Sequence, residues 1–591
     1  MKTVFFAPHA AIWIHAFPEA LIAEALAQNG HDVVYLTCGR VFERQCVPMT
    51  SMGLGFDRSP AEKAAACELC RQNANVLREN LGLRGRDIAE LLTPEDHALA
   101  ERELAGLTRE NFLQAMHAGV EYGRAALSTF LLVHKKAELV FSDAEWPILL
   151  TEIRNSLLSL LAACRVFDAE QPDRLVLYSP GYSVNLVWAK LAEKRGVAQY
   201  YIQGSNNLSD RLQKLIFTRG LYWQGENIAQ WQRFKHVPCS PSAARYVTDH
   251  FLELIKGRAA FVYSLARSDT APDLRGRFGL RPGQKLVVAT MSSYDELLAG
   301  EVTGQIPPLE RGAFRTQIEW IERLIEFFRK RDDLFLLVRV HPREFPNRRE
   351  RVKSAHAAEL EKRFTDLPPN VRVNWPSDGV SLYDLAEEMD LCLNAWSNAG
   401  KEMSFFGIPT LLYSTRTIFY APDINYAADT AAEYLSLIDV ALRDGWRLEN
   451  STKAFRWFAL DDLYSRIDLS DSYSYKEHAR RSLPVRLVRR LERMVNSTAT
   501  QARDTRARAP QLRMGPMVAK AIASGSRSLL ELMSPADLPA TTQAEEAQSV
   551  RIELRRVAQA LYGHDFSRPG GQLKRNLLSV VSSESARASH G

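Results

Sequence analysis

The chain has 591 residues, 25% of them charged and 46% hydrophobic, and its formal net charge is +5 at pH 7. This length exceeds what one hydrophobic core supports, so two or three domains are expected. The small net charge does not indicate nucleic-acid binding, and no apolar run reaches the length of a membrane span. The start "MKTVFFAPHAAIW" lacks a small-residue cleavage site and is typical of a first β-strand, so we expect a cytoplasmic protein.

Strand and helix patterns alternate along the first part of the chain, which indicates a parallel sheet in an α/β unit. The first helix ends at Gly30, a residue type typical of helix C-termini. A long insert with helical periodicity then interrupts the unit. In chain order, the expected elements are a strand at 2–8, a helix at 18–30, a strand at 31–38, the helical insert at about 60–168, and strands at 174–180 and 198–204.

A second α/β unit follows a polar linker at 268–284 that is rich in Gly and Pro. Its long helix has apolar residues at three- and four-residue spacing, which is typical of a helix packed on a sheet. The expected elements are strands at 285–293, 334–342, 371–377 and 391–395, and helices at 316–333 and 381–390. The sequence therefore predicts a first domain at 1–268, a second at 280–480, and a basic tail at 485–591 that is helical or partly disordered.

Polar residues follow several strands of the second unit. Thr290 and Ser292 follow its first strand, His341 follows "LFLLVRV", and Ser397 follows "LCLNA". Ligands of open α/β sheets bind outside the carboxyl ends of the strands, where hydroxyls, imidazole and backbone N–H groups can meet a nucleotide phosphate. The alternative is purely structural, because Ser and Asn cap helices and Gly and Pro form turns.

Two motifs carry a resemblance to a known family. The spacing of Ser397, Glu402, Gly407 and Pro409 resembles the donor-site signature of GT-B glycosyltransferases. The "HPRE" at 341–344 resembles the His-Pro motif of bacterial capsule and surface-polysaccharide enzymes that use cytidine nucleotides, such as Kdo transferases with CMP-Kdo. The resemblance covers about 280–420 well and 1–60 loosely.

The resemblance implies a GT-B fold, in which two Rossmann-like domains face a cleft and the nucleotide sugar binds the second domain. The helical insert and the tail depart from the capsule Kdo transferases, which leaves the sugar open. No Asp-x-Asp segment follows a strand in the context of a metal site, so transfer is expected to be independent of metal ions. The implied donor contacts are His341, Arg343, Ser397, Asn398, Gly400, Glu402 and Ser292.

The first unit offers a candidate catalytic base. "HAFP" places His15 in the loop after the first strand, and this stretch resembles the start of nucleotide-sugar transferases in which a loop His is the base. Imidazole suits this role, because its pKa is near neutral. His9 is the competing imidazole, and a wet loop residue without a catalytic role is the alternative. The expected acceptor contacts are Gln203, Ser205 and Asn206, although ordinary loop chemistry explains them equally well.

Four of the seven cysteines cluster near the start of the insert. Cys38, Cys46, Cys67 and Cys70 have the spacing C-x7-C-x20-C-x2-C, and four thiolates suit tetrahedral zinc. We therefore expect a structural zinc site and no cofactor for catalysis. Buried free thiols, a redox pair and an iron–sulfur cluster are the alternatives.

The tail contains a basic run at 485–513 with eight Arg residues, Glu492 and Asp504. Its first part places Val and Leu on one helical face and Arg on the other, which is typical of a helix at an anionic membrane surface. The alternative is a helix whose apolar face packs on the body of the protein. The first alternative predicts peripheral contact with the inner membrane.

Together these patterns predict a glycosyltransferase that moves a sugar from a nucleotide sugar, with a CMP-linked acid sugar favoured. The expected acceptor is a surface polysaccharide or lipid-linked glycan. A sugar-nucleotide 2-epimerase and a non-catalytic scaffold on a degenerate GT-B fold are the alternatives. The sequence leaves the oligomeric state open.

Overall fold

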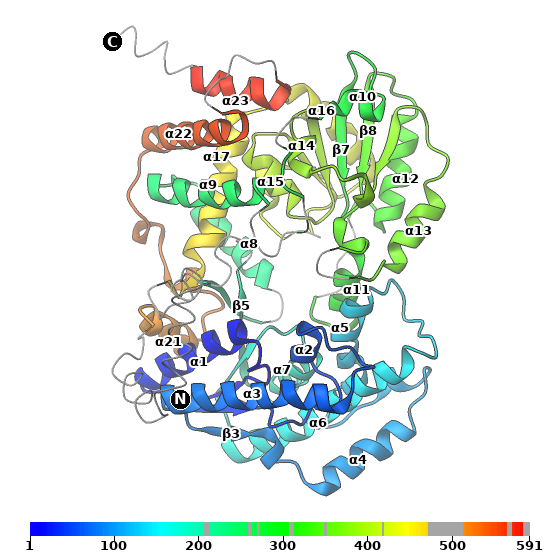
Figure 1. Ribbon diagram of the computed structural model, residues 1–591. Helices are drawn as coiled ribbons and strands as arrows, with labels where there is room; N and C mark the ends of the chain where they lie inside the picture. Colours follow the sequence, from blue (N-terminus) through cyan, green and yellow to red (C-terminus); the bar gives the residue numbers. More distant parts are fainter. Residues whose placement is uncertain are drawn as a thin grey trace, which may run out of the picture.

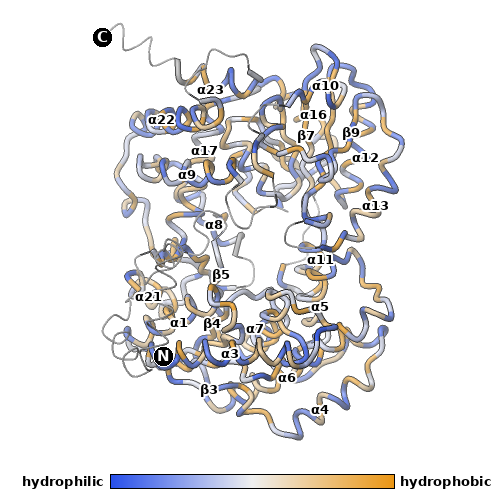
Figure 2. Tube along the Cα trace, in the orientation of Figure 1, coloured by the Kyte–Doolittle hydropathy of each residue, from blue (hydrophilic) through white to orange (hydrophobic). Residues whose placement is uncertain are grey.

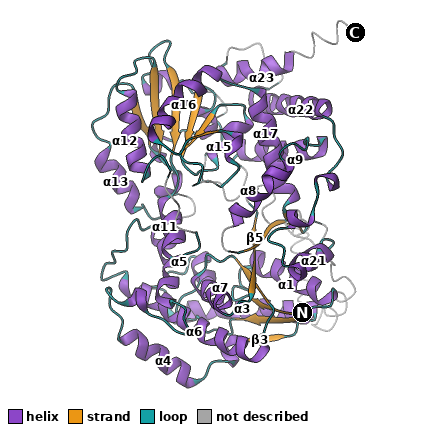
Figure 3. Cartoon of the chain, turned by 180° about the vertical axis from the view of Figure 1, so that it is seen from behind, coloured by secondary structure: helices purple, strands orange, loops and turns teal. Residues whose placement is uncertain are grey.

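A computed structural model describes residues 1–205, 213–220, 223–257, 263, 265–268, 272–306, 312–347, 351–416, 419–470, 512–563 and 570–582. Two α/β units, each built on its own sheet, are stacked on one another (Figure 1). Seen from behind in Figure 3, helices flank the strands of both units. Hydrophobic residues collect in the interior of each unit in Figure 2.

The first sheet has seven strands in the order β13-β6-β5-β4-β1-β2-β3. Strands β1 to β5 run parallel, whereas β6 is antiparallel to β5 and β13 is antiparallel to β6. The bounds are β1 Lys2–Phe6, β2 Asp32–Thr37, β3 Gly85–Asp87, β4 Arg174–Tyr178, β5 Ala198–Gly204, β6 Lys214–Arg219 and β13 Arg466–Asp468.

The second sheet has six parallel strands in the order β12-β11-β10-β7-β8-β9. Counted within each unit, the order of the first six strands is 3-2-1-4-5-6, which is the order of a Rossmann sheet. The expected α/β fold with two Rossmann-like units is therefore confirmed. The bounds are β7 Lys285–Thr290, β8 Leu334–Arg339, β9 Val371–Asn374, β10 Met389–Asn394, β11 Thr410–Leu412 and β12 Tyr426–Ala427.

Helices cover the first sheet and form the expected insert between β2 and β4. Helix α6 of the insert is long and apolar enough to cross a membrane by length and composition, but 72% of that window is buried inside the protein. It therefore serves as a core helix here. The bounds are α1 Trp13–Gln28, α2 Val47–Ser51, α3 Pro60–Leu81, α4 Pro94–Ala105, α5 Tyr122–His134, α6 Trp146–Glu170, α7 Ser183–Lys194 and α8 Trp223–Phe234.

The helices of the second unit include one from the range that the sequence assigned to the first domain. Helix α9 packs Val247 and Phe251 into the core beneath β7, because its apolar face matches that sheet rather than the first one. The bounds are α9 Pro241–Ile255, α10 Leu274–Phe278, α11 Tyr294–Val302, α12 Gln317–Phe328, α13 Ala355–Arg363, α14 Leu382–Leu385, α15 Ala399–Phe405, α16 Ala431–Asp444 and α17 Leu448–Ala459.

After α17 the chain returns to the first unit and then goes back to the second. Strand β13 joins the edge of the first sheet, and α21 (Gly515–Ser524) packs on α1. Helices α22 (Gln543–Tyr562) and α23 (Gln572–Ser582) then pack on the second unit. The described part of the tail is thus packed structure, whereas most of the basic run, 485–511, lies outside the described residues.

Two sets of contacts join the units. On one side, α11 follows β7 of the second unit but places Ala299 in the core of the first, beside α5. On the other side, Asp461 lies in a π-helical turn, Leu460–Tyr464, and accepts from Asn227 of the first unit at 2.7 Å. Its other oxygen lies 3.7 Å from Lys401 Nζ of α15. Buried polar contacts therefore hold the two units in one arrangement.

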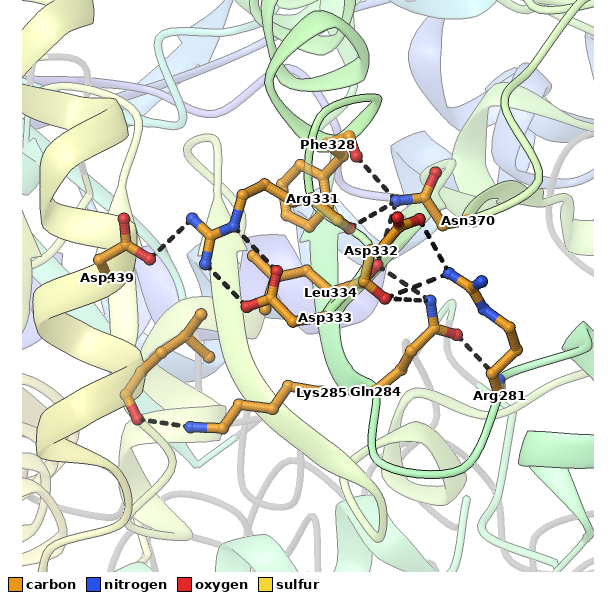
Figure 4. A network of polar contacts seen from close by, with 11 residues as sticks. Arg281, Gln284, Lys285, Phe328, Arg331, Asp332, Asp333, Leu334, Asn370 and Asp439 are labelled. Atoms are coloured by element: carbon orange, nitrogen blue, oxygen red, sulfur yellow. Dashed lines mark hydrogen bonds and ion pairs between the residues drawn. The ribbon is translucent and has the colours of Figure 1, made fainter.

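Figure 4 shows a polar network at the amino edge of the second sheet. Asn370 Nδ2 donates to the carbonyls of Phe328, Arg331 and Leu334, and the Arg331 guanidinium pairs with Asp333 and Asp439. These contacts fix the starts of β7 and β8.

Candidate functional site

The switch point of the first sheet lies between β1 and β4, where the strand order reverses. The loop after β1 brings His9 there, and the first turn of α1 brings His15, so His15 is helical and does not lie in the loop expected from the sequence. The His15 ring stacks on Tyr178 at the end of β4, with ring centroids 4.1 Å apart and planes 20° apart. The His9 ring meets Tyr182 edge-on at 4.7 Å. His9 is buried whereas His15 is partly exposed, which makes His15 the better placed of the two for contact with an acceptor.

Burial has a direct effect on the charge of this site. Desolvation, with a smaller contribution from His15, lowers the pKa of His9 to about 3, so His9 is neutral at pH 7. Glu19 lies one turn after His15 on α1 and accepts a 2.9 Å hydrogen bond from the Tyr178 N–H. Burial raises the pKa of Glu19 well above its usual value. His9 therefore adds no charge beside His15 near neutral pH, and burial opposes ionisation of Glu19.

The aromatic surface under His15 is held by the neighbouring strand. The Gly204 N–H at the end of β5 donates to the Tyr178 hydroxyl at 3.0 Å. Ser179, the next residue after Tyr178, has φ +55°, a left-handed conformation that is uncommon for residues other than glycine. Such backbone strain often lies at functional sites. The sequence alone gave no sign of this conformation.

The expected acceptor residues lie at the same edge of the sheet, because β5 is parallel to β4. Gln203, the last residue but one of β5, is partly exposed, and Ser205, directly after the strand, is buried. The Ser205 N–H donates to the Lys214 carbonyl at 3.1 Å, so its backbone belongs to the sheet. Asn206 lies outside the described residues.

The switch point of the second sheet lies between β7 and β10 and is organised by one buried amide. The Thr290 hydroxyl donates to Asn394 Oδ1 at 2.7 Å. Asn394 Nδ2 donates to the Ser397 carbonyl and to the Tyr420 hydroxyl, both at 2.9 Å. Asn394 and Tyr420 are fully buried. This Asn394 hub joins both strand ends to the loop that carries the expected donor contacts.

The residues after β10 are arranged around this hub. The Ala399 N–H donates to Ser397 Oγ at 3.3 Å, while the Asn398 side chain is exposed. A side chain at Gly400 would overlap the Tyr420 hydroxyl, so this position requires glycine. Glu402 accepts from the Tyr383 hydroxyl at 3.1 Å, and burial raises its pKa.

His341 lies after β8, on the other side of β7 from Ser397. Two strand spacings, about 10 Å, separate β8 from β10. His341 Nδ1 accepts from the Arg343 N–H at 3.2 Å. Desolvation, followed by the charges of Arg343, Arg339 and Lys135, lowers the pKa of His341 to about 3. The neutral ring then carries its proton on Nε2, which makes it a hydrogen-bond donor for a phosphate oxygen.

The Arg343 side chain contacts other protein groups. It is buried, its guanidinium pairs with Asp295 at the start of α11, and it also donates to the Leu132 carbonyl of α5 at 3.1 Å. Lys135 Nζ, from the end of the same helix, donates to the Arg343 carbonyl at 2.5 Å. Residues of the first unit therefore hold the loop that carries His341, and the donor contact expected for Arg343 stays a prediction.

The backbone of Ser292, which follows β7, is hydrogen-bonded to another side chain of the protein. Its N–H donates to Gln317 Oε1 at 2.8 Å, and its carbonyl accepts from Gln317 Nε2 at 3.0 Å. Asp295 and Glu296 occupy the first turn of α11, the helix that follows. Their carboxylates oppose a phosphate at this helix start, so an anionic ligand would lie nearer to His341 and Ser397.

The four clustered cysteines line one cavity of about 30 Å³ in the first unit. Among the described residues, which include all four, no three His, Cys, Asp or Glu side chains form a group that could hold a metal ion. Burial raises the pKa of Cys38 to about 12 and that of Cys70 to about 11, so these thiols are protonated. Zinc requires thiolates. In this arrangement the four cysteines are free thiols, and the four-cysteine zinc site stays a prediction from their spacing.

The carboxyl edges of the two sheets face the same region between the units. Gln305, after α11, donates to the Ser128 hydroxyl of α5 at 2.6 Å. Ser128 Oγ in turn donates to the Gly181 carbonyl, in the loop after β4, at 2.9 Å. The segment after α11 and the loop after β4 are thus connected through one serine. The carboxyl edge of the first sheet therefore lies on the side of its unit that contacts the second unit.

Comparisons with known proteins place few limits on this chain. No protein-family model and no curated protein sequence matches it. Similar solved structures include the spinosyn rhamnosyltransferase SpnG, with 14% identity, 83% of this chain and 100% of that chain covered, and a TM-score of 0.23. A UDP-N-acetylglucosamine 2-epimerase has 11% identity, coverage of 78% and 92%, and a TM-score of 0.20. The β-Kdo 2,4-transferase KpsC of Thermosulfurimonas dismutans has 14% identity, coverage of 49% and 80%, and a TM-score of 0.30. Values this low leave the function to be inferred from the residues of the chain.

Proposed function

We propose that the protein is a glycosyltransferase that takes a sugar from a nucleotide-sugar donor. The observation that carries this proposal is the pairing of two Rossmann switch points across one region between the units. An imidazole lies at the first of them, and a phosphate-compatible set of donors lies at the second. Each switch point alone is common, whereas two facing each other suit a reaction between two bound molecules.

The proposed donor site uses the second unit. The His341 Nε2–H, the Ser397 hydroxyl and the Asn398 amide would meet the phosphate, and Glu402 would accept from a ribose hydroxyl. Hydrogen-bond donors of this kind stabilise the negative charge that grows on the leaving nucleotide. No Asp-x-Asp segment follows a strand of this unit, so we propose that transfer requires no divalent metal ion.

The proposed acceptor site uses the first unit, with Gln203 and Ser205 near it. As the acceptor oxygen forms its bond to the anomeric carbon, the bond to the nucleotide breaks, and His15 takes the hydroxyl proton. The finer identity follows the sequence motifs: a CMP-linked acid sugar as donor, and a surface polysaccharide or lipid-linked glycan as acceptor. We propose that the enzyme acts in the cytoplasm, at the inner face of the membrane, because the proposed acceptor would be found there.

The test is incubation with CMP-linked and UDP-linked sugars, with the products resolved by NMR. Released nucleotide supports the transferase, a changed sugar on intact nucleotide would indicate the epimerase, and neither product would favour the scaffold.

The His15→Ala variant then tests the base. The rate should fall by about two to four orders of magnitude while donor affinity stays constant, because the other unit holds the donor. His31→Ala is the matched control, since His31 directly precedes β2 and lies at the amino edge of the same sheet. Equal loss of activity in both variants would remove His15 from the mechanism.

A further inference from the structure

A basic pocket lies within the helical insert of the first unit. Its volume is about 870 Å³, and its walls come from the loop after β2, the start of α3, the end of α4 and the start of α6. Figure 1 shows α2, α3, α4 and α6 gathered at the lower end of the molecule. Four basic and two acidic side chains line it: Arg40, Arg44, Arg58, Lys63, Glu43 and Glu101.

The arginines of this pocket are accessible, and each forms an exposed ion pair: Arg40 with Glu43, Arg44 with Glu101, and Arg58 with Glu62. The side chains of Arg40, Arg44 and Arg58 are each about half exposed. Arg44 shares a single carboxylate oxygen, Glu101 Oε1, with Arg154, at 2.7 and 2.8 Å. One acid thus faces two guanidinium groups. Exposed ion pairs of this kind contribute little, so an incoming anion can compete for the arginines.

The floor of the pocket is rigid. Lys63 is buried, and its Nζ donates to the carbonyls of Arg44 and Phe56, both at 2.8 Å. Asn155 Nδ2, on α6, donates to the Gln45 carbonyl at 2.8 Å. These contacts fix the backbone that carries Arg44, so the guanidinium group starts from a defined position. Prior ordering of this kind reduces the entropy lost when a ligand binds.

One wall of the pocket is apolar. Phe56 is exposed, and Leu104 and Leu150 also line the space. Guanidinium groups beside such a wall suit a ligand that carries carboxylates or phosphates on an otherwise compact frame. The concave shape and the large volume favour a saccharide chain as the ligand. A flat membrane surface would instead require a convex or flat patch on the protein.

The basic pocket has a neighbouring cavity that reaches the loop before His15. Arg40 lines both this pocket and the small cavity of the four cysteines. Pro8 and Ala10, in the loop that leads to His15, also line that cavity. Arg40 has φ +72°, so the loop after β2 holds it in an uncommon conformation. The pocket thus lies along the same carboxyl edge of the sheet as the proposed acceptor side.

We propose that the pocket lined by Arg40, Arg44 and Arg58 binds the acidic part of a polyanionic glycan. The binding itself stands on the geometry of the pocket, while the assignment of that glycan as the acceptor chain rests on the proposed function. A long acidic chain bound here would extend toward His15 with its acceptor end.

The probe is an oligosialic acid hexamer, titrated calorimetrically into the full chain in the absence of any donor. Arg44→Gln with Arg58→Gln should weaken its binding at least about tenfold, because charge-assisted hydrogen bonds are lost. Arg84→Gln is the matched control: Arg84 is about half exposed and pairs with Asp32 at the opposite edge of the sheet. Neutral maltohexaose should not bind, and binding of the hexamer should weaken as salt is raised.

A variant that is expected to strengthen binding distinguishes a change in the pocket from unfolding of the protein. Glu43→Gln removes the acid that pairs with Arg40 at 3.4 Å, so it should tighten binding of the hexamer. Equal affinity in all variants, or no binding at all, would overturn the proposal. Binding only to vesicles that contain phosphatidylglycerol would also overturn it. The same holds if inorganic phosphate displaces the hexamer at equal concentration. Because no donor is present, the result is independent of whether the protein transfers sugar.

Discussion

Replacing Gly400 with alanine tests whether the Asn394 hub fixes the proposed donor site. The added Cβ would overlap the Tyr420 hydroxyl and lie 2.6 Å from Asn394 Nδ2. Tyr420 is fully buried, and its hydroxyl is held by Asn394 Nδ2. Overpacking of this kind destabilises by about 1–3 kcal/mol. Loss of the 2.9 Å Asn394–Tyr420 hydrogen bond adds about 1 kcal/mol.

The expected total of about 2–4 kcal/mol corresponds to a melting temperature lower by roughly 5–15 °C for a unit of this size. Thermal unfolding followed by tryptophan fluorescence measures this shift. Gly106→Ala is the control, because Gly106 has an ordinary φ of −92° and its Cβ would lie 3.6 Å from the nearest atom. That variant should change the melting temperature by less than about 2 °C.

A double mutant makes the test specific. Tyr420→Phe removes the hydroxyl that Gly400→Ala would strike, so the two changes together should destabilise less than the sum of the single changes. The expected coupling is about 1–2 kcal/mol. If Gly400→Ala unfolds like the wild type, or if the two effects simply add, the close approach of Tyr420 does not require glycine. Nucleotide affinity, measured on the same samples, should follow the order of stability.

Three further predictions follow from buried contacts. Lys135→Met should weaken donor binding about tenfold in calorimetry, because the loop that carries His341 loses the hydrogen bond from Lys135 Nζ to the Arg343 carbonyl. Lys136→Met, the neighbouring control, should leave donor binding unchanged. Burial lowers the pKa of His250 to about 3, so its contribution to stability is complete above about pH 6.5 and is lost as pH falls toward 3. His250→Gln should therefore reduce the pH dependence of the free energy of unfolding, measured by urea titration, by up to about 1.4 kcal/mol per pH unit. An unchanged slope would contradict this. Deleting residues 512–591 removes helices from both cores and should leave both units sensitive to limited proteolysis, and a deletion that stays protease-resistant would show that the tail is dispensable.

The central strands were predictable because their signals are local. Continuous apolar runs marked β1, β7, β8 and β10, and a strand buried on both faces needs little else. The positions of Ser397 and His341 at strand ends followed from the same runs. Strand β13 was missed, because three residues carry almost no pattern and its partner β6 lies far away in the sequence.

The details of the site depend on contacts that no local pattern encodes. Tyr420 bonds to Asn394 across 26 positions, and Lys135 reaches Arg343 across 208. Spacing suggested metal ligands at the cysteines, whereas the structure shows them as free thiols around one small cavity. The sequence thus indicated which residues are near each strand end, whereas the packing of distant segments decided which of them can meet a ligand.

The pairing of β13 with β6 has a consequence for how the chain is made. During synthesis, β6 emerges roughly 250 residues before the strand that covers its outer edge. At about 5–20 residues per second, that edge remains open on the ribosome for roughly 12–50 s. An open strand edge is a template for pairing with another chain. Nascent copies on one messenger RNA are therefore expected to be most prone to aggregate in this interval, and chaperone occupancy should be greatest while residues 220–470 are being added.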